Sequence, residues 1–128
     1  MNQHIPVPKY AGKLVLVTGA AQRVGADIVR YLSGRGLNVL VHYYSSKIPA
    51  ETLKSEIERT SMVRIDLVTG DLSKEEEVNT IFTKFSPDIV INNAGRFDEE
   101  NFDANVNANA RTAFLVTRAA IKRMLVDG

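Results

Sequence analysis

Short apolar runs alternate along this chain with longer segments whose apolar residues recur at helical spacing. The first run, Leu14–Val17, is unbroken, as in parallel strands that are covered on both faces. The strand stops at Thr18-Gly19, and a short turn follows. Beyond the turn, apolar residues recur at helical spacing at Val24, Ile28, Tyr31 and Leu32. The pattern therefore predicts a buried strand, a turn and an amphipathic helix within Lys13–Leu32.

The same alternation continues along the rest of the chain. Gly34 and Gly36 end the first helix. Three more strands are predicted at Asn38–Tyr43, Met62–Val68 and Ile89–Ile91. Three more helices are predicted at Pro49–Arg59, Ser73–Phe85 and Glu100–Met124. Polar residues alternate with apolar ones in Met62–Val68, so this strand is expected at the edge of the sheet.

Start signals and apolar stripes support these helices. Pro49 opens the second helix, whose inward face is Leu53 and Ile57. Ser73 and Glu76 form a capping box for the third helix. That helix then carries one apolar stripe at Val78, Ile81, Phe82 and Phe85, which is expected to pack in the core. The last helix carries the apolar residues Phe102, Val106, Phe114, Leu115 and Ile121.

Four strands that alternate with four helices predict an α/β fold. Because crossovers between parallel strands are right-handed, the sheet takes the strand order 3-2-1-4 with helices on both faces. This is the first half of a Rossmann-like, doubly wound, three-layer fold. Its strand order reverses between strands one and four, and a ligand-binding crevice is expected there, at the carboxyl ends of the strands.

The turn after the first strand suits an anionic ligand. A helix that begins directly after a buried strand points its unpaired N–H groups, and the positive end of its dipole, into the crevice. Gly19 can adopt the positive φ of a tight turn, and Gly25 lets helix and strand approach closely. The pattern favours a phosphate or pyrophosphate site over a purely structural turn.

Composition limits the class of protein. A length of 128 residues and a hydrophobic content of 45% fit one globular domain. Residues 1–12 are expected to be an irregular lead-in, and residues 13–128 a dinucleotide-binding Rossmann domain. Sixteen basic and fifteen acidic residues give a net charge of +1, so no nucleic acid or membrane partner is expected.

The chain offers little for metal or thiol chemistry. It has no cysteine, which excludes disulfides, thiolate metal sites and cysteine nucleophiles. His4 and His42 alone do not make a metal cluster, so no metal site is expected. No signal peptide or membrane-spanning run is present in the sequence, and the expected location is the cytoplasm.

The glycine turn carries a recognisable motif. The segment Thr18–Gly25, T-G-A-A-Q-R-V-G, resembles the T-G-x-x-x-G-x-G turn of the short-chain dehydrogenase/reductases, with Arg23 where the middle glycine usually stands. Together with His42–Ser45, H-Y-Y-S, this arginine is similar to the pteridine reductase branch. The resemblance implies an NADP(H)-dependent reductase. It also implies cofactor contacts from Gly19, Gln22, Arg23, Val24 and Gly25.

Three further segments resemble parts of that family's site. Asn92–Gly95 matches an N-N-A-G segment that steadies the sheet and lines the cofactor, which implies contacts from Asn93, Ala94 and Gly95. Asp71-Leu72 resembles the segment whose aspartate meets the adenine. Asn109 resembles the asparagine of the catalytic tetrad, which kinks its helix and holds a water in a proton relay. Without the resemblance, these residues also fit ordinary turns and a polar helix face.

The exit of the second strand predicts which dinucleotide binds. An NAD site needs a carboxylate there for the ribose 2′-OH. Residues 42–47 read H-Y-Y-S-S-K, so no carboxylate would repel a 2′-phosphate. Arg23 can fork onto that phosphate while Ser45 or Ser46 donates a hydrogen bond. We therefore expect NADP(H) to contact His42, Tyr43, Tyr44 and Ser45. The alternative leaves Arg23 a solvated residue at the start of the helix.

The resemblance covers the chain from Lys13 onward but only about the first half of the family's domain. The family's catalytic serine and Tyr-x-x-x-Lys segment should come after the next strand, beyond Gly128, and the matching spacing of Tyr43 and Lys47 is read as coincidence. Thirteen residues separate Gly95 from Asn109, fewer than the family usually has, so a shortened loop is expected. Either the chain is a fragment of a longer polypeptide, or something else covers the edge of the fourth strand.

The leading hypothesis is the NADP(H)-binding portion of an oxidoreductase that transfers hydride to a carbonyl or pterin-type C=N substrate. Alone, the chain is expected to be inactive, and a homo-oligomer is expected because the family dimerises through the last helix and its successor. A non-catalytic dinucleotide-binding or scaffolding module is the alternative. A methyltransferase-like enzyme is disfavoured because no acid lies between Ile28 and Ala50.

Overall fold

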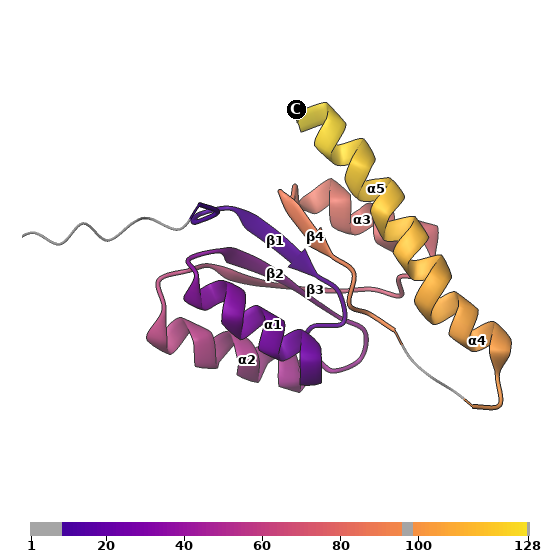
Figure 1. The fold of residues 1–128 in the computed structure, drawn as a ribbon, viewed down its shortest axis with the longest axis horizontal. Helices are drawn as coiled ribbons and strands as arrows, with labels where there is room; N and C mark the ends of the chain where they lie inside the picture. Colours follow the sequence, from indigo (N-terminus) through magenta and orange to yellow (C-terminus); the bar gives the residue numbers. More distant parts are fainter. Residues whose placement is uncertain (1–8, 96–98, 128) are drawn as a thin grey trace, which may run out of the picture.

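Four parallel strands lie at the centre of the computed structural model, which describes residues 9–95 and 99–127 (Figure 1). The strands are β1 Leu14–Val17, β2 Asn38–Tyr43, β3 Ile65–Thr69 and β4 Ile89–Ile91. Their order is β3-β2-β1-β4, so the predicted order 3-2-1-4 is confirmed. It also places β3 at one edge, as its alternating sequence predicts.

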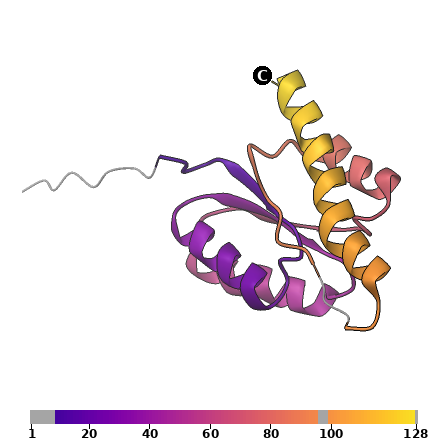
Figure 2. The ribbon, with the colours of Figure 1, turned by 45° about the vertical axis from the view of Figure 1, so that its right-hand side comes forward.

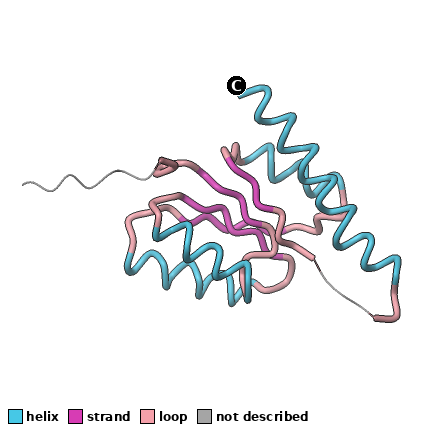
Figure 3. Tube along the Cα trace, viewed as in Figure 1, coloured by secondary structure: helices cyan, strands magenta, loops and turns pink. Residues whose placement is uncertain are grey.

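Helices cover both faces of the sheet (Figures 1 and 2). On one face lie α1 Arg23–Gly34 and α2 Lys47–Thr60. On the other lie α3 Glu75–Lys84 and α5 Thr112–Asp127. Figure 3 shows the resulting three layers, with the strands between the two groups of helices. The predicted three-layer α/β architecture is therefore confirmed. Among the described residues, no helix is long and apolar enough to cross a membrane.

Alternation along β1 explains why both faces need helices. Val15 and Val17 pack with α1 and α2 in one core cluster, while Leu16 packs with α3 and α5 in another. Successive side chains of a strand point to opposite faces, so an unbroken apolar strand must be covered twice. Val15, Leu16 and Val17 are each at most 1% exposed, as the sequence predicts.

Half of the apolar stripe predicted for α1 faces the core: Ile28 and Leu32 are partly buried against it, and Val24 and Tyr31 are not. Val24 and Tyr31 are 65% and 61% exposed, while the buried positions are Gly25, Ala26, Val29 and Ser33. Small residues let the helix lie close to the strands. This close packing outweighs the burial of the larger side chains of Val24 and Tyr31. The buried hydroxyl of Ser33 is satisfied because it donates to the carbonyl of Val29 at 2.5 Å.

Three predicted element starts are wrong. Helix α2 begins at Lys47, two residues before Pro49, which occupies its first turn. Strand β3 begins at Ile65 and not at Met62, whose side chain is fully exposed. The capping box predicted at Ser73 and Glu76 is absent, because Lys74 is the N-cap of α3 and makes no side-chain cap.

The start of α3 is organised by Asp71 instead of a capping box. Its carboxylate Oδ1 accepts both the hydroxyl of Ser73 at 2.6 Å and the Ser73 N–H at 3.0 Å. The N–H of Asp71 donates to the carboxylate of Glu77 at 2.9 Å. This aspartate turn competes successfully with the helix cap for the serine hydroxyl.

The predicted last helix, Glu100–Met124, is interrupted. It consists of α4 Phe102–Val106, a π-helical turn at Asn107–Arg111, and α5. Asn101 caps α4 by accepting the N–H of Ala104 at 3.0 Å. Of the predicted apolar residues only Leu115 is buried, and the others are 42–77% exposed: Phe102, Val106, Phe114 and Ile121. A π turn inserts one residue and rotates the helix face, and such turns occur often at functional sites.

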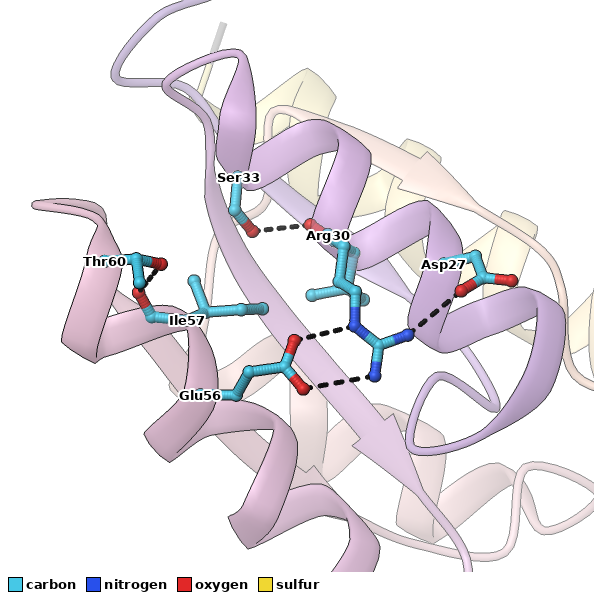
Figure 4. Close-up of polar contacts among 7 residues, drawn as sticks. Asp27, Arg30, Ser33, Glu56, Ile57 and Thr60 are labelled. Carbon is cyan, nitrogen blue, oxygen red and sulfur yellow. Dashed lines mark hydrogen bonds and ion pairs between the residues drawn. The ribbon is translucent and has the colours of Figure 1, made fainter.

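An exposed ion pair connects the two helices on one face of the sheet (Figure 4). Arg30 on α1 donates from Nε and Nη2 to the carboxylate of Glu56 on α2, at 2.7 and 3.3 Å. The same guanidinium reaches Asp27 at 3.0 Å. The hydrogen bond from Arg30 is the main reason that the pKa of Glu56 is lowered. Because all three side chains are exposed, the network orients α1 and α2 more than it stabilises the fold.

Candidate functional site

The carboxyl ends of β1 and β4 are joined by the side chain of Thr18. Its Oγ1 accepts the main-chain N–H groups of Asn93 and Ala94, both at 2.9 Å. The Thr18 N–H donates to the carbonyl of Ile91 at 3.1 Å. Thr18 is 1% exposed, so this hydroxyl satisfies two donors inside the fold. It fixes the segment after β4 beside the glycine turn.

Gly19 is held from both sides. Its N–H donates to Nδ1 of His42 at 3.0 Å, and its carbonyl accepts Nδ2 of Asn93 at 3.1 Å. Its φ of +59° is the left-handed conformation in which glycine costs least. A Cβ at this position would lie 2.9 Å from the Cα of Ala94. The turn therefore requires glycine for both conformation and space.

Gly25 is where α1 approaches the turn most closely. A Cβ there would lie 2.5 Å from the carbonyl oxygen of Gly19, 2.7 Å from the Cα of Ala20 and 2.7 Å from Nδ2 of Asn93. Two of these neighbours are backbone, which cannot move aside. The N-terminus of α1 is thus brought against the turn, and its first N–H groups have no partner within the helix.

Arg23 has an unusual backbone. Its φ of +54° makes it the one non-glycine residue with positive φ among residues 9–95 and 99–127. Such a conformation costs an ordinary side chain about 1–3 kcal/mol and concentrates at functional sites. Arg23 lines a cavity of about 540 Å³, called here the glycine-turn cavity. Its other lining residues are Gly19, Gln22, Val24, Gly25, His42, Tyr44, Asn93, Ala94 and Gly95.

A second cavity of about 470 Å³, called here the β3-exit cavity, adjoins the first. The two share His42, Tyr44, Ala94 and Gly95. The β3-exit cavity adds residues from the β3–α3 turn, α4, the π segment and the first position of α5: Gly70, Asp71, Leu72, Ser73, Ala104, Asn107, Ala108 and Thr112. The hydrogen bonds from Ser73 are the main reason that the pKa of Asp71 is lowered, so its carboxylate is favoured at this cavity.

Asn109 lies in the π turn, against the segment that follows β4. A Cβ added to Gly95 would fall on the side-chain oxygen of Asn109. The neighbouring Ala108 lines the β3-exit cavity, and its carbonyl accepts the Thr112 hydroxyl at 2.7 Å. The interruption of the helix therefore coincides with Asn109.

The sequence model of the short chain dehydrogenase family matches residues 13–128. This chain belongs to the short-chain dehydrogenase family. Hydroxynaphthalene reductase-like protein Arp2 of Metarhizium guizhouense is 33% identical over 123 residues, which cover 86% of this chain and 46% of that protein. A short-chain dehydrogenase/reductase of Pestalotiopsis microspora is 34% identical over 140 residues, covering 99% and 52%. The chain thus spans about half the length of these relatives.

Solved structures agree on the fold. A putative dehydrogenase from Burkholderia cenocepacia with bound NADP has a TM-score of 0.80 and 25% identity, covering 92% of this chain and 50% of that one. A short-chain dehydrogenase/reductase from Serratia marcescens has a TM-score of 0.80 and 22% identity, covering 89% and 51%. The sheet and helices described above are thus those of the first half of a short-chain dehydrogenase.

Most of the residues that the sequence assigns to a short-chain dehydrogenase site come together. Twelve line one or both cavities: Gly19, Gln22, Arg23, Val24, Gly25, His42, Tyr44, Asp71, Leu72, Asn93, Ala94 and Gly95. Tyr43 and Ser45 line neither cavity. Tyr43 ends β2 with its side chain on the opposite face from His42, because side chains alternate along a strand.

Several contacts at this candidate site are not predictable from the sequence. The sequence predicts Thr18 only as part of the turn, although a polar residue that ends a buried strand must find partners inside the fold. Ser46 donates to Oε1 of Gln22 at 3.4 Å, which ties the exit of β2 to the glycine turn. Arg111 donates from Nε to the carbonyl of Ser73 at 2.9 Å. Only the three-dimensional structure shows these last two contacts.

Some sequence expectations lie outside the described residues. These are the lead-in up to residue 8, which contains His4, and residues 96–98 of the shortened loop. Within residues 9–95 and 99–127, no three histidine, aspartate or glutamate side chains are grouped so that they could hold a metal ion.

Proposed function

We propose that this chain is the NADP(H)-binding portion of a short-chain dehydrogenase. The observation that carries the proposal is Arg23, held with positive φ at the edge of the glycine-turn cavity. No aspartate or glutamate is among the residues that line this cavity in the described part of the chain. Among the described residues, a 2′-phosphate would therefore meet the guanidinium of Arg23 and no carboxylate, the reverse of what an NAD site offers its ribose.

The residues present fit a dinucleotide. The N-terminus of α1 is brought against the turn at Gly19 and Gly25, where its N–H groups can bind a pyrophosphate. Asp71 and Leu72 line the adjoining cavity, and we assign the adenine to that side. We assign the segment Asn93–Gly95, held by Thr18, to the wall beside the nicotinamide half. When bound, the cofactor supplies a hydride to an electrophilic carbon.

Asn109 is the catalytic residue that we propose within this chain. It lies in the π turn against Gly95, next to residues that line the β3-exit cavity. In this role its helix segment would hold a water for proton transfer. The proton-donating tyrosine of a Tyr-x-x-x-Lys segment would come from outside residues 9–95 and 99–127, because Tyr43, which has that spacing to Lys47, lines neither cavity.

For the substrate we propose a carbonyl compound or a pterin-type C=N compound. Two resemblances support a reductase: a relative is described as hydroxynaphthalene reductase-like, and the sequence of Arg23 with His42–Ser45 is similar to that of the pteridine reductase branch. The test pairs this chain with the full-length polypeptide that contains it, if one exists, or with a matching second half from a relative. NADPH oxidation with aldehydes, ketones and pterins should appear only in the longer or paired protein.

A non-catalytic dinucleotide-binding module is the second candidate. It is favoured by the position of Tyr43, the only tyrosine in the chain with a lysine four residues later, because its side chain faces away from both cavities. Binding of NADPH without hydride transfer in any longer or paired form supports this candidate. Hydride transfer that is lost on Asn109→Ala supports the reductase.

We also propose that the chain forms a homo-oligomer through α5. Phe114, Ile121 and Leu125 are 60%, 51% and 77% exposed and lie along one side of this helix. Phe114 and Ile121 also line a shallow groove of about 590 Å³. Exchange of Ile121 for glutamate should shift light-scattering mass toward a monomer, whereas the same exchange at exposed Ile48 on α2 should not.

A further inference from the structure

His42 is a buried histidine between two loops of the cofactor site. It lies near the end of β2, is 2% exposed and lines both the glycine-turn cavity and the β3-exit cavity. Its Nδ1 is 3.0 Å from the N–H of Gly19, and its Nε2 is 2.9 Å from the carbonyl oxygen of Gly70. One ring therefore connects the turn after β1 with the turn after β3.

These two partners define the protonation state of the ring. The Gly19 N–H is a donor, so Nδ1 must be the unprotonated acceptor. The Gly70 carbonyl is an acceptor, so Nε2 must carry the proton. His42 is thus neutral in the folded protein. Burial lowers its pKa, although the hydrogen bond to Gly70 acts in the opposite direction.

Each partner belongs to a loop that the proposed cofactor would touch. Gly19 opens the glycine turn, and its carbonyl is held in turn by Asn93. Gly70 directly precedes Asp71, which lines the β3-exit cavity. The main-chain N–H of Ala20 also donates to the carbonyl of His42 at 2.8 Å. The residue therefore holds the glycine turn through both its backbone and its ring.

We propose that His42 is a positioning residue that sets the glycine turn for dinucleotide binding, through an unprotonated Nδ1 that accepts the Gly19 N–H. The proposal rests on the proposed function for the identity of the ligand. The ring does not need to touch the ligand, because it acts through Gly19 and Gly70. The same geometry makes the site sensitive to acid: a protonated His42 presents an N–H to the N–H of Gly19, and the turn loses its support.

Several charged or titratable groups surround this ring, and they are named because they bear on its protonation. Arg23 lines the glycine-turn cavity, and Tyr44 lines both cavities. Asp71 lines the β3-exit cavity, and its N–H, next to Gly70, donates to the carboxylate of Glu77 on α3. Arg111 of the π turn reaches the carbonyl of Ser73. Burial lowers the pKa of His42 below the ordinary histidine value of 6.5, so a transition that reports the ring is expected below that pH.

Two variants test the contacts of the two ring nitrogens separately. In His42→Asn, the amide oxygen takes the place of Nδ1 and can accept the Gly19 N–H, while the contact with Gly70 is lost. In His42→Gln, the amide nitrogen can reach Gly70, while the acceptor for Gly19 is lost. We expect NADPH to bind His42→Asn within about threefold of the unmutated chain, and His42→Gln at least about tenfold more weakly. His42→Phe should resemble His42→Gln.

A pH profile gives a second readout. Affinity for NADPH should fall in the unmutated chain as the pH drops through the folded-state pKa of His42, which burial lowers below the ordinary value of 6.5. The 2′-phosphate of NADPH also changes charge near pH 6. Because this change affects both proteins equally, the pH profile of the unmutated chain is compared with that of His42→Asn, and the difference between the two profiles reports His42. An equal fall in both proteins would overturn the proposal.

Nitrogen-15 spectra of the ligand-free chain give a readout that needs neither cofactor nor variant. They should show the Nε2-protonated tautomer of His42, and acid should move the Gly19 amide resonance together with the ring. A proton on Nδ1, or a Gly19 amide that ignores the titration, would contradict the proposal even if every variant failed to fold. Absence of NADPH binding by the unmutated chain counts instead against the proposed function, and the spectra still decide the role of His42.

Discussion

The hydroxyl of Thr18, at the end of β1, accepts the main-chain N–H of Ala94, beyond the end of β4, at 2.9 Å. The same oxygen accepts the N–H of Asn93. Thr18→Val keeps the shape but leaves both donors without this acceptor, which should lower the free energy of unfolding by about 1–3 kcal/mol. Thr18→Ser keeps the oxygen and loses one methyl group, worth about 0.8 kcal/mol. Urea unfolding of the two variants checks the order; a serine variant as unstable as the valine variant would contradict the role of the hydroxyl.

Two glycines of α1 should respond in opposite directions to alanine. At Gly25 a Cβ would meet backbone atoms of Gly19 and Ala20 at 2.5 and 2.7 Å, so Gly25→Ala should cost about 1–3 kcal/mol and weaken NADPH binding. At Gly34 nothing lies within 4 Å, so Gly34→Ala should stabilise by about 0.5–1 kcal/mol. Thermal unfolding with and without NADPH measures both effects. Equal stability of the two variants would mean that α1 does not approach the turn as described.

The carboxylate of Asp71 should show a depressed pKa that depends on Ser73. Hydrogen bonds from Ser73 favour the charged form, so the folded-state pKa lies below the ordinary value of 3.8. The stability that this group contributes is therefore complete above pH 3.8 and is lost as the pH falls through the folded-state pKa. In Ser73→Ala the pKa should rise toward 3.8, and in Ser73→Thr it should stay low. Carbon-13 titration of the Asp71 carboxyl group measures this pKa directly. An unchanged pKa in Ser73→Ala would show that the hydrogen bonds from Ser73 do not lower it.

The 128-residue chain alone should not turn over. Tyr43 and Lys47 have the spacing of the family's catalytic pair, but Tyr43 lines neither cavity and Lys47 is exposed at the start of α2. NADPH oxidation with a panel of aldehydes, ketones and pterins is expected at background level. Clear turnover that disappears in Tyr43→Phe would show that this pair is catalytic after all.

Strand order and core were predictable because the apolar pattern of each strand determines which of its faces must be buried. A run such as Leu14–Val17 must be buried on both faces, and right-handed crossovers then leave little freedom in the order of the strands. The glycine turn was predictable for a similar reason, because Gly19 and Gly25 are required by a positive φ and a close approach. These features depend on local sequence and general rules.

The remaining features depend on contacts between distant residues. The face of α1 that is buried follows from its fit against the sheet, which favours Val29 and Ser33 over Val24 and Tyr31. The capping box at Ser73 was predicted from spacing alone, but Asp71 competes for the same hydroxyl. The π turn around Asn109 likewise interrupts a segment whose local pattern is that of a continuous helix. The sequence assigned a role to Asn109 only through family resemblance.

The preference between the two dinucleotides tests the proposed function most directly. Arg23 lines a cavity in which no described residue contributes a carboxylate, and a charge-assisted contact with a phosphate is worth about 1.5–3 kcal/mol. Titration calorimetry of the unmutated chain should therefore show NADPH binding at least about tenfold more tightly than NADH. Arg23→Gly relieves the positive φ and removes the guanidinium, and Arg23→Ala removes the guanidinium alone.

In both Arg23 variants we predict that most of the difference disappears while NADH affinity stays nearly unchanged. Arg35→Ala is the matched control, since Arg35 is an arginine at the opposite end of α1, where it donates to the hydroxyl of Tyr31. It should keep the full preference for NADPH. Equal affinities for NADPH and NADH in the unmutated chain, or a preference that survives the loss of Arg23, would contradict the assignment of this site to NADP(H).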